Sequence, residues 1–106
     1  MALNYEFKEF VLDQLSSIEV FETKNMFGGL ALLVEGGAFA KLKHDRLWLK
    51  ANEQNKSYFI EKGMKQYSYG KDNSRKLNFY ETPIDILENK DKLKVWVQRS
   101  IDCISK

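Results

Sequence analysis

The sequence predicts one two-layer α+β domain, an antiparallel sheet with its helices mainly on one face. The expected elements run in the order helix, three or four strands, helix, two strands, helix. Strands joined by short turns must pair antiparallel, and each expected helix has a single apolar stripe to bury. No linker, repeat or low-complexity stretch divides the 106 residues, so we expect one domain over residues 1–106.

The first helix is expected over residues 4–17, with Asn4 as its N-cap, because apolar side chains recur with a 3.6-residue period. Its predicted stripe consists of Leu3, Phe7, Phe10, Val11, Leu15 and Ile18. We expect Phe10 and Leu15 in the core, together with residues of later elements. These later core residues are Leu32, Leu47, Leu49, Phe59, Trp96 and Ile101.

Three or four strands are expected next. Residues 19–25 have a weak strand signal, and the apolar run at residues 30–35 is too short for a helix and typical of a buried strand. Gly36 and Gly37 predict a tight hairpin turn. Residues 38–43 and 46–50 alternate in polarity and are expected to pair around His44 and Asp45.

The C-terminal half is expected to hold a short helix, a hairpin and a long helix. Asn52 is the predicted cap of the short helix, and Gly63 is the residue that ends it. Residues 65–70 and 75–81 should form the hairpin around the polar turn at residues 71–74.

The last helix should run to about residue 104, with a bend near Asn89. Its start is predicted from Thr82 as a hydroxyl cap, Pro83 in the first turn and Asp85 three residues after the cap.

The composition argues against several functional classes. The net charge of +2 is too small for a generic nucleic-acid binder, and no apolar run approaches the roughly 18–20 residues of a membrane span. The N-terminus carries an acid, Glu6, where a signal peptide is basic, so we expect a cytoplasmic protein with no membrane contact. The charge is uneven: residues 1–22 are acidic, whereas residues 41–50 and 62–76 are basic.

No residue pattern predicts catalysis, and we expect no enzyme, cofactor or metal site. His44 is the sole histidine and lies in a predicted turn, and Cys103 lies beside the apolar stripe of the last helix as a half-buried thiol. Gly28 and Gly29 are followed by no phosphate-binding motif, so we interpret them as a strand entry with close backbone packing.

The candidate interaction face combines aromatic and cationic side chains on one side of the strands at residues 38–43 and 46–50. Strand alternation places on it Phe39, Lys41, Lys43, Arg46, Trp48 and Lys50. Three readings remain open: a protein interface, including a homodimer seam; a solvated sheet whose lysine stems shield the rings; and a nucleic-acid surface. The nucleic-acid reading is not favoured, because the net charge supplies little long-range attraction.

Several segments resemble one known family in their order and spacing. They are the run at residues 25–36 (NMFGGLALLVEG), Phe39–Ala40, residues 45–50 (DRLWLK), Gly63–Met64, residues 67–69 (YSY) and residues 79–83 (FYETP). Over about residues 8–104 the chain resembles the N-terminal domain of the TfoX/Sxy family, bacterial regulators of natural competence.

The resemblance implies a fold like that of type III secretion chaperones and a non-enzymatic role in regulating DNA-uptake genes. It also implies a protein partner in the transcription machinery, and it supplies no catalytic residue. Two features depart from the family pattern. Ala31 stands where a third glycine is usual. Many family regulators also carry a second, C-terminal domain, which we do not expect here, so the activity of that domain is not carried over.

Overall fold

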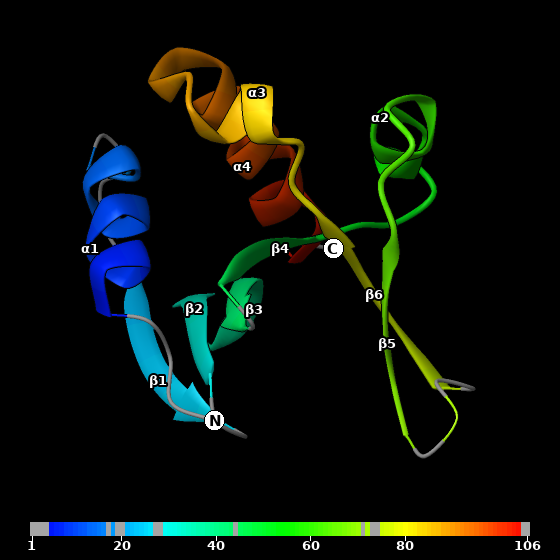
Figure 1. The fold of residues 1–106 in the computed structure, drawn as a ribbon, viewed down its shortest axis with the longest axis horizontal. Helices are drawn as coiled ribbons and strands as arrows, with labels where there is room; N and C mark the ends of the chain where they lie inside the picture. Colours follow the sequence, from blue (N-terminus) through cyan, green and yellow to red (C-terminus); the bar gives the residue numbers. More distant parts are fainter. Residues whose placement is uncertain are drawn as a thin grey trace.

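The computed structural model describes residues 5–16, 18, 21–26, 29–43, 45–70, 72 and 75–104. In these residues the structure has ten elements, and they follow the predicted order except that two helices stand where one C-terminal helix was predicted (Figure 1). They are α1 (Tyr5–Gln14), β1 (Glu22–Met26), β2 (Gly29–Val34), β3 (Gly37–Lys43), β4 (Arg46–Lys50), α2 (Lys56–Glu61), β5 (Gln66–Tyr69), β6 (Arg75–Glu81), α3 (Ile84–Leu87) and α4 (Lys90–Ile104). The expectations for Asn4, Gly28 and His44 lie outside the described residues.

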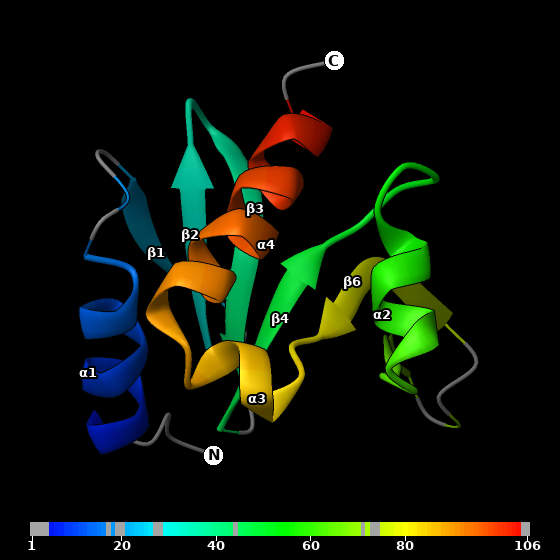
Figure 2. The ribbon, with the colours of Figure 1, turned by 90° about the horizontal axis from the view of Figure 1, so that it is seen from above.

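The six strands form one antiparallel sheet in the order β1-β2-β3-β4-β6-β5. The helices lie on its convex side, with α4 packed across β3 and β4 (Figures 1 and 2). Between the two layers lies the main core. To this core α1 contributes Val11, the turn directly after α1 contributes Leu15, α2 contributes Phe59, and α4 contributes Leu93 and Val97. The predicted two-layer α+β fold with helices on one face is confirmed.

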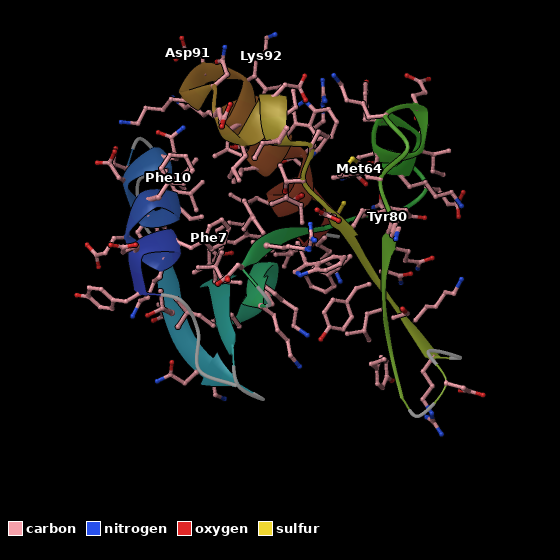
Figure 3. All side chains as sticks on the ribbon, in the orientation of Figure 1. Phe7, Phe10, Met64, Tyr80, Asp91 and Lys92 are labelled. Carbon is pink, nitrogen blue, oxygen red and sulfur yellow. The ribbon has the colours of Figure 1, made fainter. Side chains whose placement is uncertain are left out.

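The apolar face of α1 is narrower than predicted, and the expectation that Phe10 is buried is wrong. Val11 and Leu15 are buried, and Phe7, on the side of α1 that faces the sheet, packs against the main core (Figure 3). These three residues are four apart, whereas Phe10 is turned about 100° from Val11 around the helix and is 41% exposed. The other predicted core residues are buried, except Ile101, which is half-buried against the core.

A β-bulge in β3 changes which face Phe39 occupies. Ala38 pairs with Leu33 and Ala40 with Leu32, so Phe39 is the extra residue between two consecutive pairs. Phe39 and Ala40 consequently both pack into the main core, and Phe39 is fully buried. The prediction that Phe39 lies on the open sheet face is therefore wrong, because the extra residue of a bulge interrupts the alternation of side chains between the two faces.

The predicted last helix is two helices, and Thr82 does not cap the first of them. Pro83 is the N-cap residue of α3 and makes no side-chain cap bond. The Thr82 hydroxyl is buried and has no hydrogen-bond partner among the described residues. Near the predicted bend, the Asn89 side chain accepts a hydrogen bond from the Lys92 amide at 3.0 Å and so caps α4.

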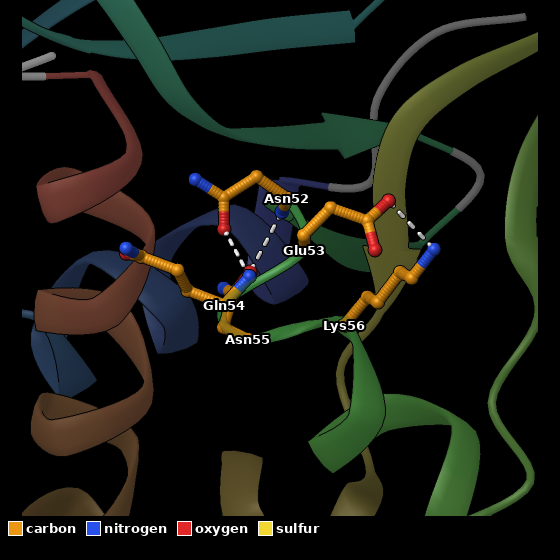
Figure 4. Close-up of polar contacts among 5 residues, drawn as sticks. All are labelled: Asn52, Glu53, Gln54, Asn55 and Lys56. Atoms are coloured by element: carbon orange, nitrogen blue, oxygen red, sulfur yellow. Dashed lines mark hydrogen bonds and ion pairs between the residues drawn. The ribbon is translucent and has the colours of Figure 1, made fainter.

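An asparagine-rich turn leads from β4 into α2 (Figure 4). The Asn52 amide donates to Asn55 Oδ1 at 2.7 Å, and the Gln54 amide donates to Asn52 Oδ1 at 2.8 Å. Asn52 therefore organises the turn rather than capping the helix as predicted, and α2 begins only at Lys56. Gly63 ends this segment with a φ of +74°, as predicted.

Candidate interaction site

A second apolar cluster lies on the sheet face opposite the helices. It consists of the aromatic side chains of Trp48, Tyr67 and Phe79, with Ala38 and Leu77 packed against it. Trp48 and Tyr67 make an edge-to-face contact with ring centroids 4.9 Å apart. We call these three residues the aromatic cluster.

The β5–β6 hairpin brings the aromatic cluster together because it curls across this face. Only the last residues of β6 pair with β4, where Phe79 lies opposite Lys50 and Glu81 opposite Trp48. The rest of the hairpin extends past β4, and the sheet is concave on the side without helices (Figure 1). Such coiling follows from the right-handed twist of the strands, and it makes a hollow where a flat sheet would present an open surface.

Three lysine side chains lie over the rings of the aromatic cluster. Lys41 Nζ is 5.1 Å from the Tyr67 ring centroid and 5.4 Å from that of Phe79. Lys43 Nζ is 5.9 Å from Tyr67, and Lys50 Nζ is 5.4 Å from Phe79. These distances are within the range of cation–π attraction, so the rings hold the amines in a row along the concave face.

A cavity of about 410 Å³ lies between β2 and β3 on one side and the hairpin on the other. Its volume is in the usual range for ligand pockets. We call this cavity with its lysine rim the groove, and its characteristic lining residues are Ala31, Lys41, Lys43, Tyr67, Tyr69 and Leu77.

The surroundings of Lys41 in the groove change the pKa of its amine. Burial lowers the pKa of the Lys41 amine, and the neighbouring positive charge of Lys43 lowers it further. The Trp48 indole N–H donates to the Lys43 backbone carbonyl at 3.3 Å, which ties the aromatic cluster to the lysine-bearing strand. An anion placed between the two amines would relieve their repulsion and replace lost hydration.

The structure brings together four of the six predicted face residues. Lys41, Lys43, Trp48 and Lys50 lie on the concave face, and Trp48 is only 9% exposed because the hairpin covers it. Arg46 forms an ion pair with Glu81. Phe39, the sixth, is buried in the core on the opposite face.

Sequence reasoning missed the hairpin half of the groove. Tyr67, Tyr69, Leu77 and Phe79 alternate along β5 and β6 as residues of one face should. That alternation was a usable signal, but it did not show that the hairpin curls back over β3 and β4.

The other predicted features have structural roles. Cys103 is half-buried as predicted, with its sulfur 3.5 Å from Asn55 Oδ1 and 3.3 Å from the Arg99 carbonyl oxygen. A Cβ at Gly29 would lie 2.4 Å from the Leu42 carbonyl oxygen, so the predicted close backbone packing is confirmed there.

Neither a metal centre nor a membrane-spanning helix is found in the part of the chain that the structure describes. No three histidine, cysteine, aspartate or glutamate side chains there are arranged to hold a metal ion. No helix there is long and apolar enough to cross a bilayer.

Fold and site together define a small α+β domain whose antiparallel sheet carries helices on one face and a lysine-rimmed groove on the other. The sequence matches the TfoX N-terminal domain family over residues 13–104. The chain belongs to this family, which is generally non-enzymatic. A search of curated proteins found no match to the sequence.

Proposed function

We propose that the chain is a non-enzymatic regulatory domain that acts in the bacterial cytoplasm by binding a protein partner in the groove. Its membership of the TfoX N-terminal domain family supports a regulatory role in competence or in transcription more broadly. The observation that carries the proposal is the row of lysine amines beside an apolar cavity, since both lie on the face that the helices leave uncovered.

The burial of the aromatic cluster favours a protein partner over nucleic acid. Proteins that bind single strands stack bases on exposed rings. Trp48, Tyr67 and Phe79 are instead 9%, 6% and 8% exposed and pack against one another. A cavity with apolar walls and a charged rim suits the side chains of a peptide better than a polyanion.

Nucleic-acid binding is the second candidate, because three lysines share one face. It predicts affinity that falls with salt by a log–log slope of about −0.7 per phosphate contact on single strands. We expect weak or no oligonucleotide binding, because the net charge of +2 and the exposed acids of α1 give little long-range attraction. Titration of labelled oligonucleotides at low and physiological salt measures this directly.

Partner capture in the organism that encodes the chain tests the proposed function. The tagged wild type is compared with Lys41→Ala/Lys43→Ala and with a control variant, Lys92→Ala/Lys94→Ala. Both control lysines are exposed on α4, and Lys92 points away from the sheet (Figure 3). We expect the wild type and the control to capture a transcription regulator or a polymerase subunit that the groove variant loses. Equal capture by all three proteins would contradict the proposal.

A further inference from the structure

We propose that the groove binds an extended, acidic segment of the partner protein, with carboxylates at alternate positions and a large apolar side chain beside them. The two carboxylates would pair with Lys41 and Lys43, and the apolar side chain would enter the cavity. This inference rests on the proposed function, because it takes the groove as the place where the partner is bound.

The spacing of the two lysines is the first argument. Lys41 and Lys43 are alternate residues of β3, and both amines lie over the Tyr67 ring. Alternate residues of an extended chain lie on the same side and are about 7 Å apart. An extended peptide with acids at positions i and i+2 therefore repeats the spacing of the lysines that it would meet.

The second argument is the positive charge of Lys41, Lys43 and Lys50. Among the residues that the structure describes, no ion pair involves Lys41, Lys43 or Lys50, whereas Arg46 on the same sheet is paired with Glu81. Burial has removed part of the hydration of Lys41. A carboxylate would supply charge-assisted hydrogen bonds to both amines, and such bonds are stronger in a partly desolvated site.

The cavity beside the lysines is the third argument. Tyr67, Tyr69 and Leu77 form its hairpin wall, and Ala31 lies on the β2 side. A volume of about 410 Å³ leaves room for a leucine or phenylalanine side chain of a bound peptide. The Ala31 methyl group makes the cavity smaller than a glycine would at this position.

The acidic helix of a second copy fits the groove less well than an extended peptide does. The exposed acids of α1 are Glu6, Glu9 and Asp13, which are three and four residues apart. This spacing puts them along one side of a helix at 1.5 Å per residue. Glu9 and Asp13 are therefore about 6 Å apart along α1, close to the spacing of alternate strand residues, and the acid spacing alone does not separate the two partners. A helix with its side chains is about 10–12 Å across, which is too wide for a cavity of about 410 Å³, whereas one side chain of an extended peptide fits.

Fluorescence anisotropy with synthetic peptides tests the inference. The main probe is a labelled nonapeptide with glutamates at positions four and six, phenylalanine at position eight, and serine, threonine or glycine elsewhere. One control peptide has the same composition with the two glutamates adjacent, and another has glutamine in place of both. Oligothymidylate and analytical sedimentation cover the nucleic-acid and second-copy alternatives.

We expect the alternate-glutamate peptide to bind most tightly and the glutamine peptide at least about tenfold more weakly. Lys41→Gln should weaken binding of the alternate-glutamate peptide by about tenfold, and Lys92→Gln should leave it unchanged. Ala31→Leu, which fills the cavity, should weaken binding without abolishing the effect of salt. Thermal unfolding of each variant separates loss of the fold from loss of the site.

Equal affinity for the alternate and adjacent glutamate peptides would overturn the inference, and so would tighter binding of oligothymidylate. A dimer that Lys41→Gln disrupts would overturn it in favour of a second copy. If partner capture depends on Lys41 and Lys43 but no acidic peptide binds, the proposed function stands and this inference fails. If neither partner capture nor peptide binding depends on Lys41 and Lys43, the proposed function and this inference both fail.

Discussion

The Nζ atom of Lys41 lies 5.1 Å from the ring centroid of Tyr67, although these residues belong to strands three places apart in the sheet. In a flat sheet, three strand spacings would separate their backbones by about 14 Å. The contact therefore shows how strongly the sheet coils on its open side. It also explains why a face that the pattern of β3 and β4 predicts to be open is a groove.

Removing the charge of Lys41 should stabilise the fold slightly. The folded state lowers the Lys41 pKa, so the unfolded chain holds this proton more tightly and the charged amine costs the fold free energy near neutral pH. After allowance for solvent screening and lost ring contacts, Lys41→Met should raise the free energy of unfolding at pH 7 by up to about 0.5 kcal/mol.

The gain should shrink as the pH rises through the lowered pKa of Lys41 toward the ordinary lysine value, because wild-type Lys41 then loses its proton in the folded state. Urea unfolding at about pH 7 and pH 10 measures both effects, with Lys92→Met as the control. A loss of stability above about 1 kcal/mol in Lys41→Met would mean that the cation–π contacts outweigh the cost of burial.

Trp96→Ala should destabilise the domain by about 3–5 kcal/mol. The Trp96 side chain is 8% exposed and packs edge-to-face against Phe59, with ring centroids 5.0 Å apart. Chemical denaturation monitored by circular dichroism checks this value. Val95→Ala, at a position 49% exposed on the same helix, is the matched control and should change stability by less than about 1 kcal/mol.

Thr82→Val should stabilise the domain by about 1 kcal/mol, because it replaces a buried hydroxyl that lacks a partner with a methyl group of the same shape. Asn89→Ala should have the opposite effect, a loss of about 1 kcal/mol, because Asn89 caps α4. The two melting temperatures should thus move in opposite directions. A destabilised Thr82→Val variant would show that the hydroxyl makes a bond that stabilises the fold.

Gly29→Ala should cost about 1–3 kcal/mol, because the added Cβ would lie 2.4 Å from the backbone carbonyl oxygen of Leu42 and would push β2 away from β3. Asn25→Ala on the exposed edge strand β1 should be nearly neutral and serves as the control. Unfolding curves compare the two variants. A neutral Gly29→Ala would mean that the strands adjust freely at this point, and the groove with them.

Hydrophobic periodicity predicted most of the fold, because most segments keep either the 3.6-residue spacing of a helix or the alternation of a strand. Local sequence predicts that Leu47 and Leu49 face one side of β4 and Trp48 the other, and that Gly63 has a positive φ angle. Both agree with the structure. Phe39 and Thr82 were misassigned for tertiary reasons. A bulge turned Phe39 into the core, and the α3 start placed the Thr82 hydroxyl where it makes no cap bond.

The candidate site was half predictable. Lys41, Lys43, Lys50 and Trp48 come from the part of one β-hairpin that follows the bulge at Phe39, where alternation in the sequence predicts the two faces correctly. Tyr67 and Phe79 come from a different hairpin, and their position depends on the coiling of the whole sheet. Sheet curvature accumulates over many residues, so no single motif predicts it.

The most direct test of the groove as the binding site is an NMR titration of the two tryptophan indoles. Trp48 lies in the aromatic cluster and donates its indole N–H to the Lys43 carbonyl, whereas Trp96 lies in the main core on the other side of the sheet. Addition of the alternate-glutamate peptide should shift the Trp48 indole resonance and leave that of Trp96 in place. A shift confined to Trp96, or binding that moves neither resonance, would contradict the account.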